Sequence, residues 1–174
     1  MRPYSGIGIL NIPSSGVDFP VKLYEEPGII RSDMLKQEAV RELTGWLMGT
    51  PDDLFLIVTA RKGDWLKVEH DDAGRQGWLL PERRWTFVPW DQFLKGKPLL
   101  FLKNAPKKHI QILSKAGDEV GIQLTARRAM KVILIQEDWA YVLLDQTSAG
   151  WIRWRDHDGR LLVGIEPPSG SQSR

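Results

Sequence analysis

The chain carries the same aromatic pattern twice. Asp-Trp-x-x-Val, followed downstream by Gly-Trp and an apolar residue, occurs in residues 64–79 and again in residues 138–152. Self-similarity of this kind is the signature of a duplicated structural unit, and it restricts the architecture before any single side chain is interpreted. We therefore expect two units of the same fold, each with tryptophans at the same two places.

The repeat extends upstream of the tryptophans. Residues 21–28 and 110–117 both begin with alternating apolar and polar residues and reach a glycine, which predicts a half-buried strand followed by a turn. The copies are offset by 89 residues here and by 74 at the Asp-Trp pair, so the first unit has about fifteen additional residues. This insertion, at about residues 31–50, opens with the N-cap types Ser32 and Asp33, places apolar residues at 35, 39 and 43, and reaches a possible stop at Gly45. We expect a short helix or ordered loop there.

The rest of each unit reads as short strands separated by turns rich in glycine and aspartate. The predicted strands are residues 54–60, 65–69, 77–80, 129–135, 139–144 and 151–154. Hairpins at this spacing favour a mainly β fold of antiparallel barrels or sandwiches. The predicted domains are a first barrel over 1–85, an aromatic connector over 86–108 that packs the units together, a second barrel over 109–165 and a disordered tail over 166–174. Residues 89–94 are expected to form a helical turn in the connector.

Three motifs together resemble the bacterial Src-homology-3-like (SH3-like) domain, a small five-stranded barrel. They are the first strand ending at a glycine turn, the Gly-Asp-Trp-x-x-Val segment at 63–68 with its variant at 137–142, and the Gly-Trp-apolar strands at 77–79 and 150–152. The resemblance covers about two thirds of the chain and implies a binding module with an aromatic groove. Members of the family bind proline-rich peptides or are linked to cell-wall recognition.

Carried over by position, the resemblance places Tyr24, Trp65 and Pro81 in the groove of the first barrel, with Glu25 and Glu26 as its acidic loop. Trp85 stands near the place of the groove's last tyrosine, although both it and Pro81 are displaced from the family pattern. The second unit departs further, because Leu113 replaces the tyrosine and Trp154 replaces the proline. The candidate ligand-binding residues are Tyr24, Glu25, Glu26, Trp65, Trp78, Pro81, Trp85 and Trp139.

The tryptophans also have a purely structural interpretation. Trp78 and Trp151 precede apolar residues, which favours packing, whereas Trp65 and Trp139 follow polar turns and are compatible with either packing or groove lining. Trp151 and Trp154 are three residues apart and should face opposite sides of an unbulged strand.

No catalytic constellation is visible, so we expect a non-enzymatic protein without a cofactor. The runs His70-Asp71-Asp72 and Asp156-His157-Asp158 contain metal-ligand residue types, but they fall at hairpin turns, where aspartate binds the local backbone. We expect turns there and no metal site. Acid–base catalysis needs groups that converge in one cleft, and the sequence predicts none.

Composition leaves the partner and the compartment open. The net charge of +2 argues against nucleic acid as the main partner, and the absence of cysteine excludes disulfides and thiolate chemistry. No apolar run is long enough for a membrane span. The N-terminus lacks the features of a signal peptide, which is compatible with the cytoplasm, or with the cell envelope if a signal segment precedes this chain.

Our leading hypothesis is a module that binds a peptide or peptidoglycan fragment, or another protein, at the first groove or between the barrels. The alternative is an assembly scaffold with no small ligand.

Overall fold

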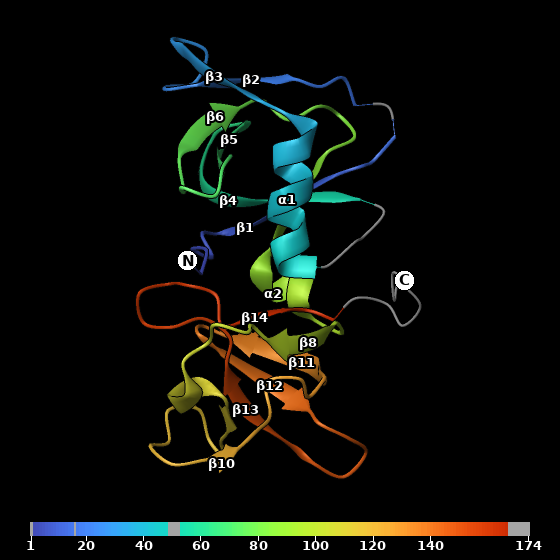
Figure 1. Ribbon diagram of the computed structural model, residues 1–174, viewed down its shortest axis with the longest axis vertical. Helices are drawn as coiled ribbons and strands as arrows, with labels where there is room; N and C mark the ends of the chain where they lie inside the picture. Colours follow the sequence, from blue (N-terminus) through green and yellow to red (C-terminus); the bar gives the residue numbers. More distant parts are fainter. Residues whose placement is uncertain (1, 16, 49–52, 167–174) are drawn as a thin grey trace. The chain divides into compact units, whose positions relative to one another are not determined.

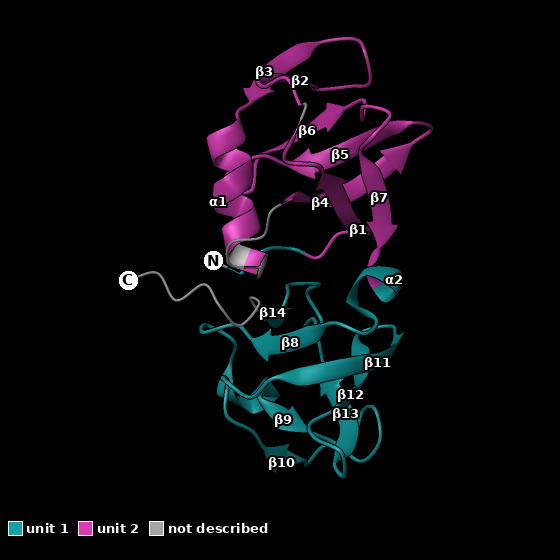
Figure 2. Cartoon of the chain, turned by 90° about the vertical axis from the view of Figure 1, so that its right-hand side faces the viewer, with its two compact units in different colours: residues 1–4, 91–170 teal, residues 5–90, 171–174 magenta. Residues whose placement is uncertain are grey.

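The computed structural model describes residues 2–15, 17–48 and 53–166. The expected tail over 166–174 therefore lies, except for Glu166, outside the described residues. The protein is mainly β, with 44% strand and 11% helix, and its sheets are antiparallel, as the sequence predicts. The described residues form two compact units, an N-terminal unit over residues 5–90 and a C-terminal unit over residues 91–166 together with residues 2–4 (Figure 2). No helix in the described part of the chain is long and apolar enough to cross a membrane.

The N-terminal unit is built on one seven-stranded sheet (Figure 1). Its strands are β1 (Gly8–Ile12), β2 (Val21–Tyr24), β3 (Arg31–Leu35), β4 (Leu54–Lys62), β5 (Trp65–Glu69), β6 (Gln76–Leu79) and β7 (Thr86–Pro89). They are hydrogen-bonded in the order β3-β2-β6-β5-β4-β1-β7. The helix α1 (Gln37–Met48) lies between β3 and β4 in the chain and packs against β4.

The C-terminal unit repeats this strand order. Its elements are α2 (Trp90–Leu94, which begins at the boundary), β8 (Pro98–Phe101), η1 (Lys107–His109), β9 (Gln111–Ile112), β10 (Ile122–Gln123), β11 (Met130–Gln136), β12 (Trp139–Leu143), β13 (Ala149–Arg153) and β14 (Val163–Ile165). One sheet runs β13-β12-β11-β8-β14 and a second pairs β10 with β9. Leu113 joins the two by exchanging both backbone hydrogen bonds with Trp151, each 2.8 Å. The combined order β10-β9-β13-β12-β11-β8-β14 corresponds place by place to that of the N-terminal unit.

The duplication extends to the register of the strands. Lys67 faces Trp78 across β5 and β6, and Tyr141 faces Trp151 across β12 and β13, at the equivalent positions of the repeat. The register of β4 shifts between Val58 and Ala60, and that of β11 shifts between positions 132 and 134, which is the same place at the repeat offset of 74. Among the described residues, none of the three sheets closes into a barrel.

A glycine at the same place in each unit allows the first strand of the repeat to approach closely. A Cβ at Gly77 would lie 3.0 Å from the Cβ of Leu23, and a Cβ at Gly150 would lie 2.6 Å from Cγ1 of Ile112. Leu23 and Ile112 are equivalent residues of the repeated strand. The glycine of each Gly-Trp motif therefore permits close packing, because an added Cβ would force the neighbouring strand to shift, further at Gly150 than at Gly77.

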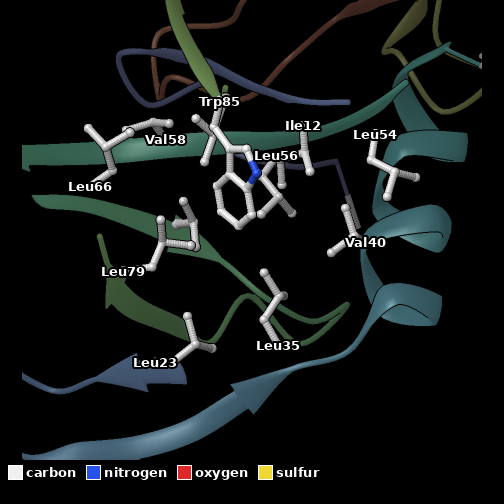
Figure 3. Packing of buried hydrophobic residues seen from close by; sticks show 12 residues of the cluster. Ile12, Leu23, Leu35, Val40, Leu54, Leu56, Val58, Leu66, Leu79 and Trp85 are labelled. Carbon is white, nitrogen blue, oxygen red and sulfur yellow. The ribbon is translucent and has the colours of Figure 1, made fainter. Parts of the chain in front are cut away.

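The core of the N-terminal unit lies on the inner face of its sheet, under α1. Buried residues of the strands gather around the ring of Trp85, which points into the cluster (Figure 3). The helix contributes Val40, Thr44 and Leu47, a spacing that places all three on one side. The hydroxyl of Thr44 bonds both the N–H and the C=O of Phe55, at 2.8 and 2.9 Å, and so fixes α1 to β4.

The helix of the insertion exists, but its expected boundaries were wrong. Ser32 and Asp33 lie in β3, which pairs with β2, and α1 begins only at Gln37. Ser32 and Asp33 favour a helix N-cap locally, but here they extend a strand whose pairing buries Leu35. The free energy of that burial outweighs the local preference for a cap. The expected stop at Gly45 was also wrong. This residue lies within α1 on an exposed face, where its cost of about 1 kcal/mol relative to alanine is tolerated.

The segment expected as a connector, 86–108, supplies one strand to the seven-stranded sheet and one to the five-stranded sheet. β7 pairs with β1 of the N-terminal unit, and β8 lies between β11 and β14 of the C-terminal unit. The division between the units falls at Trp90, in the expected helical turn, which is present as α2. The Nε1–H of Trp90 donates to the carbonyl of Ser5 at 2.5 Å. Aromatic content in this segment thus reflects strands and their packing.

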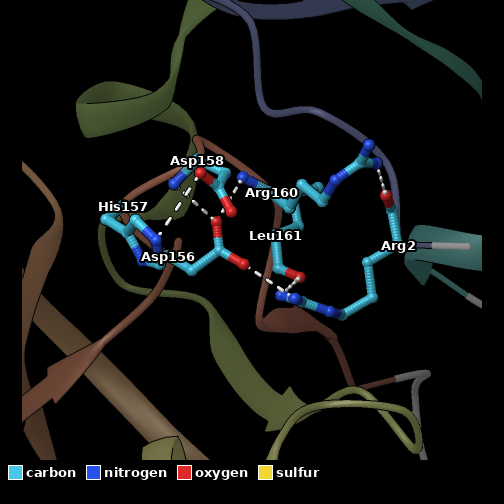
Figure 4. A network of polar contacts seen from close by, with 6 residues as sticks. All are labelled: Arg2, Asp156, His157, Asp158, Arg160 and Leu161. Carbon is cyan, nitrogen blue, oxygen red and sulfur yellow. Dashed lines mark hydrogen bonds and ion pairs between the residues drawn. The ribbon is translucent and has the colours of Figure 1, made fainter.

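The C-terminal unit also includes the first residues of the chain. The guanidinium of Arg2 donates to Asp156 at 2.7 Å and to the carbonyl of Leu161 at 3.2 Å (Figure 4). The side chain of Arg160 donates to the carbonyl of Arg2 at 2.7 Å and lies 4.0 Å from the ring centroid of Tyr4. We call residues 2–4 the N-terminal arm. It completes the turn at 156–160 and belongs to the fold of this unit.

Candidate functional site

Strand alternation gives the N-terminal unit an aromatic outer face. Along β5, Leu66 and Val68 are buried, so Trp65 and Lys67 point to the opposite side. Lys67 is paired with Trp78 on β6, and Trp78 is paired with Tyr24 on β2. Directly opposite residues lie on one face of an antiparallel sheet, which brings the three aromatic side chains together.

Tyr24 and Trp65 form the accessible part of this face. Their ring centroids are 5.3 Å apart and the rings are nearly perpendicular, at 87°, an edge-to-face arrangement typical of stable aromatic pairs. Both side chains are half-buried. Gly28 lies next to the indole, because a Cβ there would be 3.5 Å from Cζ2 of Trp65, and its positive φ of 71° suits glycine.

The loop between β2 and β3 is acidic at its start and apolar at its end. We call residues 25–30 the acidic loop. Glu25 and Glu26 are exposed, and the loop is closed by two backbone bonds, from the N–H of Glu25 to the carbonyl of Ile30 and from that of Ile29 to the carbonyl of Glu26. Ile29 is 75% exposed and Ile30 is 52% exposed. The two exposed isoleucines offer an apolar contact, and the two carboxylates beside them attract a cationic group.

The other expected groove residues differ in accessibility. Trp78 is buried, with the amine of Lys67 located 5.8 Å from its ring centroid. Pro81 is half-buried just beyond the end of β6, next to the exposed side chain of Leu80. Trp85 is only 6% exposed and lies in the core, where its Nε1–H has no partner among the described residues. Trp85 therefore packs the interior in this structure and does not line the surface beside Tyr24.

The C-terminal unit has an aromatic face at the same place. Tyr141 and Trp151 lie opposite each other with ring centroids 5.3 Å apart, and the guanidinium of Arg153 lies 4.8 Å from the ring centroid of Trp139. Trp139, Tyr141 and Trp151 are half-buried. The expected opposition of Trp151 and Trp154 is confirmed, because Trp154 is 1% exposed.

The two acidic turns are held by hydrogen bonds to the backbone. Asp71 accepts the N–H of Arg75 at 2.9 Å, and Asp156 accepts the N–H groups of Asp158 and Arg160 at 3.0 and 2.9 Å. Burial acts to raise the pKa of both carboxyls, but bonds from these donors outweigh it, and each pKa lies below its usual value. In the described part of the chain, no group of three or more acidic and histidine side chains is placed to hold a metal ion.

Neither a protein-family model nor a curated protein sequence matches this chain. The two aromatic faces are therefore the features of the chain that indicate what it could bind. Sequence reasoning missed Ile29, Ile30 and Leu80 on the first face and Tyr141 and Arg153 on the second. The sequence contains a sign of the two exposed isoleucines. They follow directly after the turn at Gly28, and no alternating apolar pattern continues from them into a buried strand. Tyr141 and Arg153 required the register, which places each of them opposite a tryptophan. Leu80 is recognised from its exposure just beyond the end of β6.

Proposed function

We propose that the chain is a non-catalytic binding module of two SH3-like barrels, and that its N-terminal unit binds an extended peptide at Tyr24 and Trp65. The strand order shared by both units supports the tandem arrangement. The observation that carries the binding site is the edge-to-face pair of Tyr24 and Trp65, half-exposed beside the acidic loop.

The chemistry of this surface specifies the kind of peptide. Aromatic rings provide a rigid apolar contact at low entropic cost, which suits proline and aliphatic side chains. Glu25 and Glu26 favour a ligand with a cationic residue, and the exposed side chains of Ile29 and Ile30 extend the apolar contact. A proline-rich peptide with one arginine at its end combines these properties, because the extended polyproline conformation is largely preformed before binding.

The experiment is a titration of the full chain with acetyl-Arg-Ala-Leu-Pro-Pro-Leu-Pro-amide, followed by the NMR signals of the tryptophan indole N–H groups. We expect the signal of Trp65 to move and that of Trp139 to stay. A muramyl peptide is titrated in parallel, because selective shifts with it and none with the proline-rich peptide would exchange the proposed ligand for a cell-wall fragment.

Two variants locate the site. Trp65→Ala is expected to weaken peptide binding at least about ten-fold, the usual effect of removing a central aromatic contact. Trp139→Ala, at the equivalent place in the C-terminal unit, is the matched control and should leave this affinity unchanged. If both peptides leave the signal of Trp65 unmoved at millimolar concentration, the N-terminal face is not a peptide site. An assembly scaffold is then the better description.

A further inference from the structure

The outer face of the C-terminal unit combines aromatic rings with uncompensated positive charge. Trp139, Tyr141 and Leu143 are alternate residues of β12. On β13, Arg153 lies opposite Trp139 and Trp151 lies opposite Tyr141. On β11, the other strand next to β12, Leu134 is paired with Tyr141 and is 42% exposed. Together with Lys131, these residues form what we call the cation–aromatic face.

Arg153 is the distinctive group of this face. Its guanidinium lies over the ring of Trp139, 4.8 Å from the ring centroid, within the range of a cation–π contact. Among the described residues, Arg153 has no ion pair and no side-chain hydrogen bond, whereas Arg155 nearby pairs with Asp138 at 2.5 Å. The positive field reaches His109, whose pKa is lowered first by burial and then by Lys108 and Arg153.

The spacing of the face corresponds to an extended chain. Arg153 and Trp151 are alternate residues of one strand, so they are separated by about 6.7 Å along it. Alternate side chains of an extended ligand have the same separation. A carboxylate in the ligand can therefore reach Arg153 while the side chain two residues away lies against the rings of Tyr141 and Trp151. A guanidinium fork matches a carboxylate in two parallel hydrogen bonds.

We propose that the cation–aromatic face binds an acidic, extended peptide segment of a partner protein, with a carboxylate at Arg153 and an apolar side chain on the Tyr141–Trp151 pair. This site lies on the other unit from the one proposed above, and its preferred ligand has the opposite charge. Single-stranded nucleic acid also combines flat groups with negative charge. It fits less well, because this face offers two cations, Lys131 and Arg153, and the chain carries a net charge of only +2.

The test uses the full chain and the peptide acetyl-Ser-Glu-Ser-Leu-Ser-amide, with its glutamine counterpart as the neutral probe. Binding is followed by the indole N–H signals of Trp139 and Trp151 and by the side-chain Nε–H of Arg153. We expect the glutamate peptide to move these signals and to bind roughly ten-fold more tightly than the glutamine peptide, the effect of a charge-assisted hydrogen bond.

Arg153→Gln is expected to weaken binding of the glutamate peptide by the same roughly ten-fold factor. Arg127→Gln, which removes an exposed cation from the same unit, should change it by less than about two-fold. An unchanged spectrum outside the face confirms that the Arg153→Gln variant is folded. Equal affinity for the two peptides, unmoved indole signals at millimolar concentration, or tighter binding of an oligothymidylate would each overturn the proposal. Because the proline-rich peptide is read out at Trp65, failure here leaves the first site untouched.

Discussion

Arg2→Ala is expected to destabilise the C-terminal unit by about 2–3 kcal/mol, although the residue lies at the start of the chain. The guanidinium bonds Asp156 at 2.7 Å and the carbonyl of Leu161 at 3.2 Å, and the side chains of Arg2 and Asp156 are 13% and 5% exposed. Removing one partner from a buried ion pair costs about 3–5 kcal/mol. The loss is smaller here, because Asp156 keeps the backbone N–H groups of Asp158 and Arg160 as donors.

The measurement has to follow each unit separately, because Arg2 and Asp156 belong to only one of the two compact units. Urea unfolding followed by NMR allows this, with the amides of Val142 and Ile152 reporting on the C-terminal unit and those of Leu10 and Val58 on the N-terminal unit. The matched control is Arg128→Ala. Arg128 pairs with Asp145 at 3.1 Å, but these side chains are 45% and 47% exposed, so the expected loss is below about 1 kcal/mol.

The same variant has an expected pH dependence. Burial acts to raise the pKa of Asp156, but the bonds from Arg160 and Arg2 outweigh it and hold the pKa below the usual 3.8. A carboxyl with a depressed pKa stabilises the fold at pH values above its unfolded pKa, and this contribution is lost as the pH falls through the folded pKa. The difference between Arg2→Ala and the parent should therefore be full at pH 7 and shrink below about pH 4. If Arg2→Ala costs no more than Arg128→Ala at neutral pH, the N-terminal arm is not part of this unit's stability.

Two further comparisons test the packing of the repeat and of the helix. Gly150→Ala should cost about 2–3 kcal/mol and Gly77→Ala about 1 kcal/mol, because the added methyl meets a backbone carbonyl at 2.8 Å in the first case and the Cβ of Leu23 at 3.0 Å in the second. Equal losses in urea unfolding would contradict this ranking. Thr44→Val should cost the N-terminal unit about 1–3 kcal/mol, because its hydroxyl bonds both backbone groups of Phe55, whereas Thr44→Ser keeps the hydroxyl and should cost less.

The parts of the fold that the sequence predicts well are those whose signal is local. The hairpins that carry Trp65 and Trp139 follow from alternating residues between glycine turns, because register in a half-buried hairpin is determined by which face is apolar. The helix α1 was predicted with the wrong start, since Ser32 and Asp33 favour an N-cap locally but belong to β3. That strand is recognisable only from its pairing with β2, which is a tertiary contact.

The candidate site shows the same division between local and tertiary information. Tyr24 and Trp65 were predicted to lie together, and their rings are in edge contact. Trp85 was placed in the groove from its position after the repeat, but it fills the core, and no periodic pattern around it distinguishes the two environments. Arg153 was missed because its role depends on its contact with Trp139, which lies opposite it on the neighbouring strand.

Comparison of the two units separates what the fold requires from what a ligand could use. Three pairs of inward positions of the repeated hairpin hold the same or similar residues, with valine at 68 and 142, glycine at 77 and 150, and leucine or isoleucine at 79 and 152. These side chains pack against the core, and the glycines admit the neighbouring strand. Outward positions differ, since position 67 is lysine and 141 is tyrosine, while position 80 is leucine and 153 is arginine. The outward tryptophans remain in both units while their neighbours and the charge around them change. A common scaffold that keeps its aromatic surface but alters the groups beside it supports the proposal that the two faces bind different ligands.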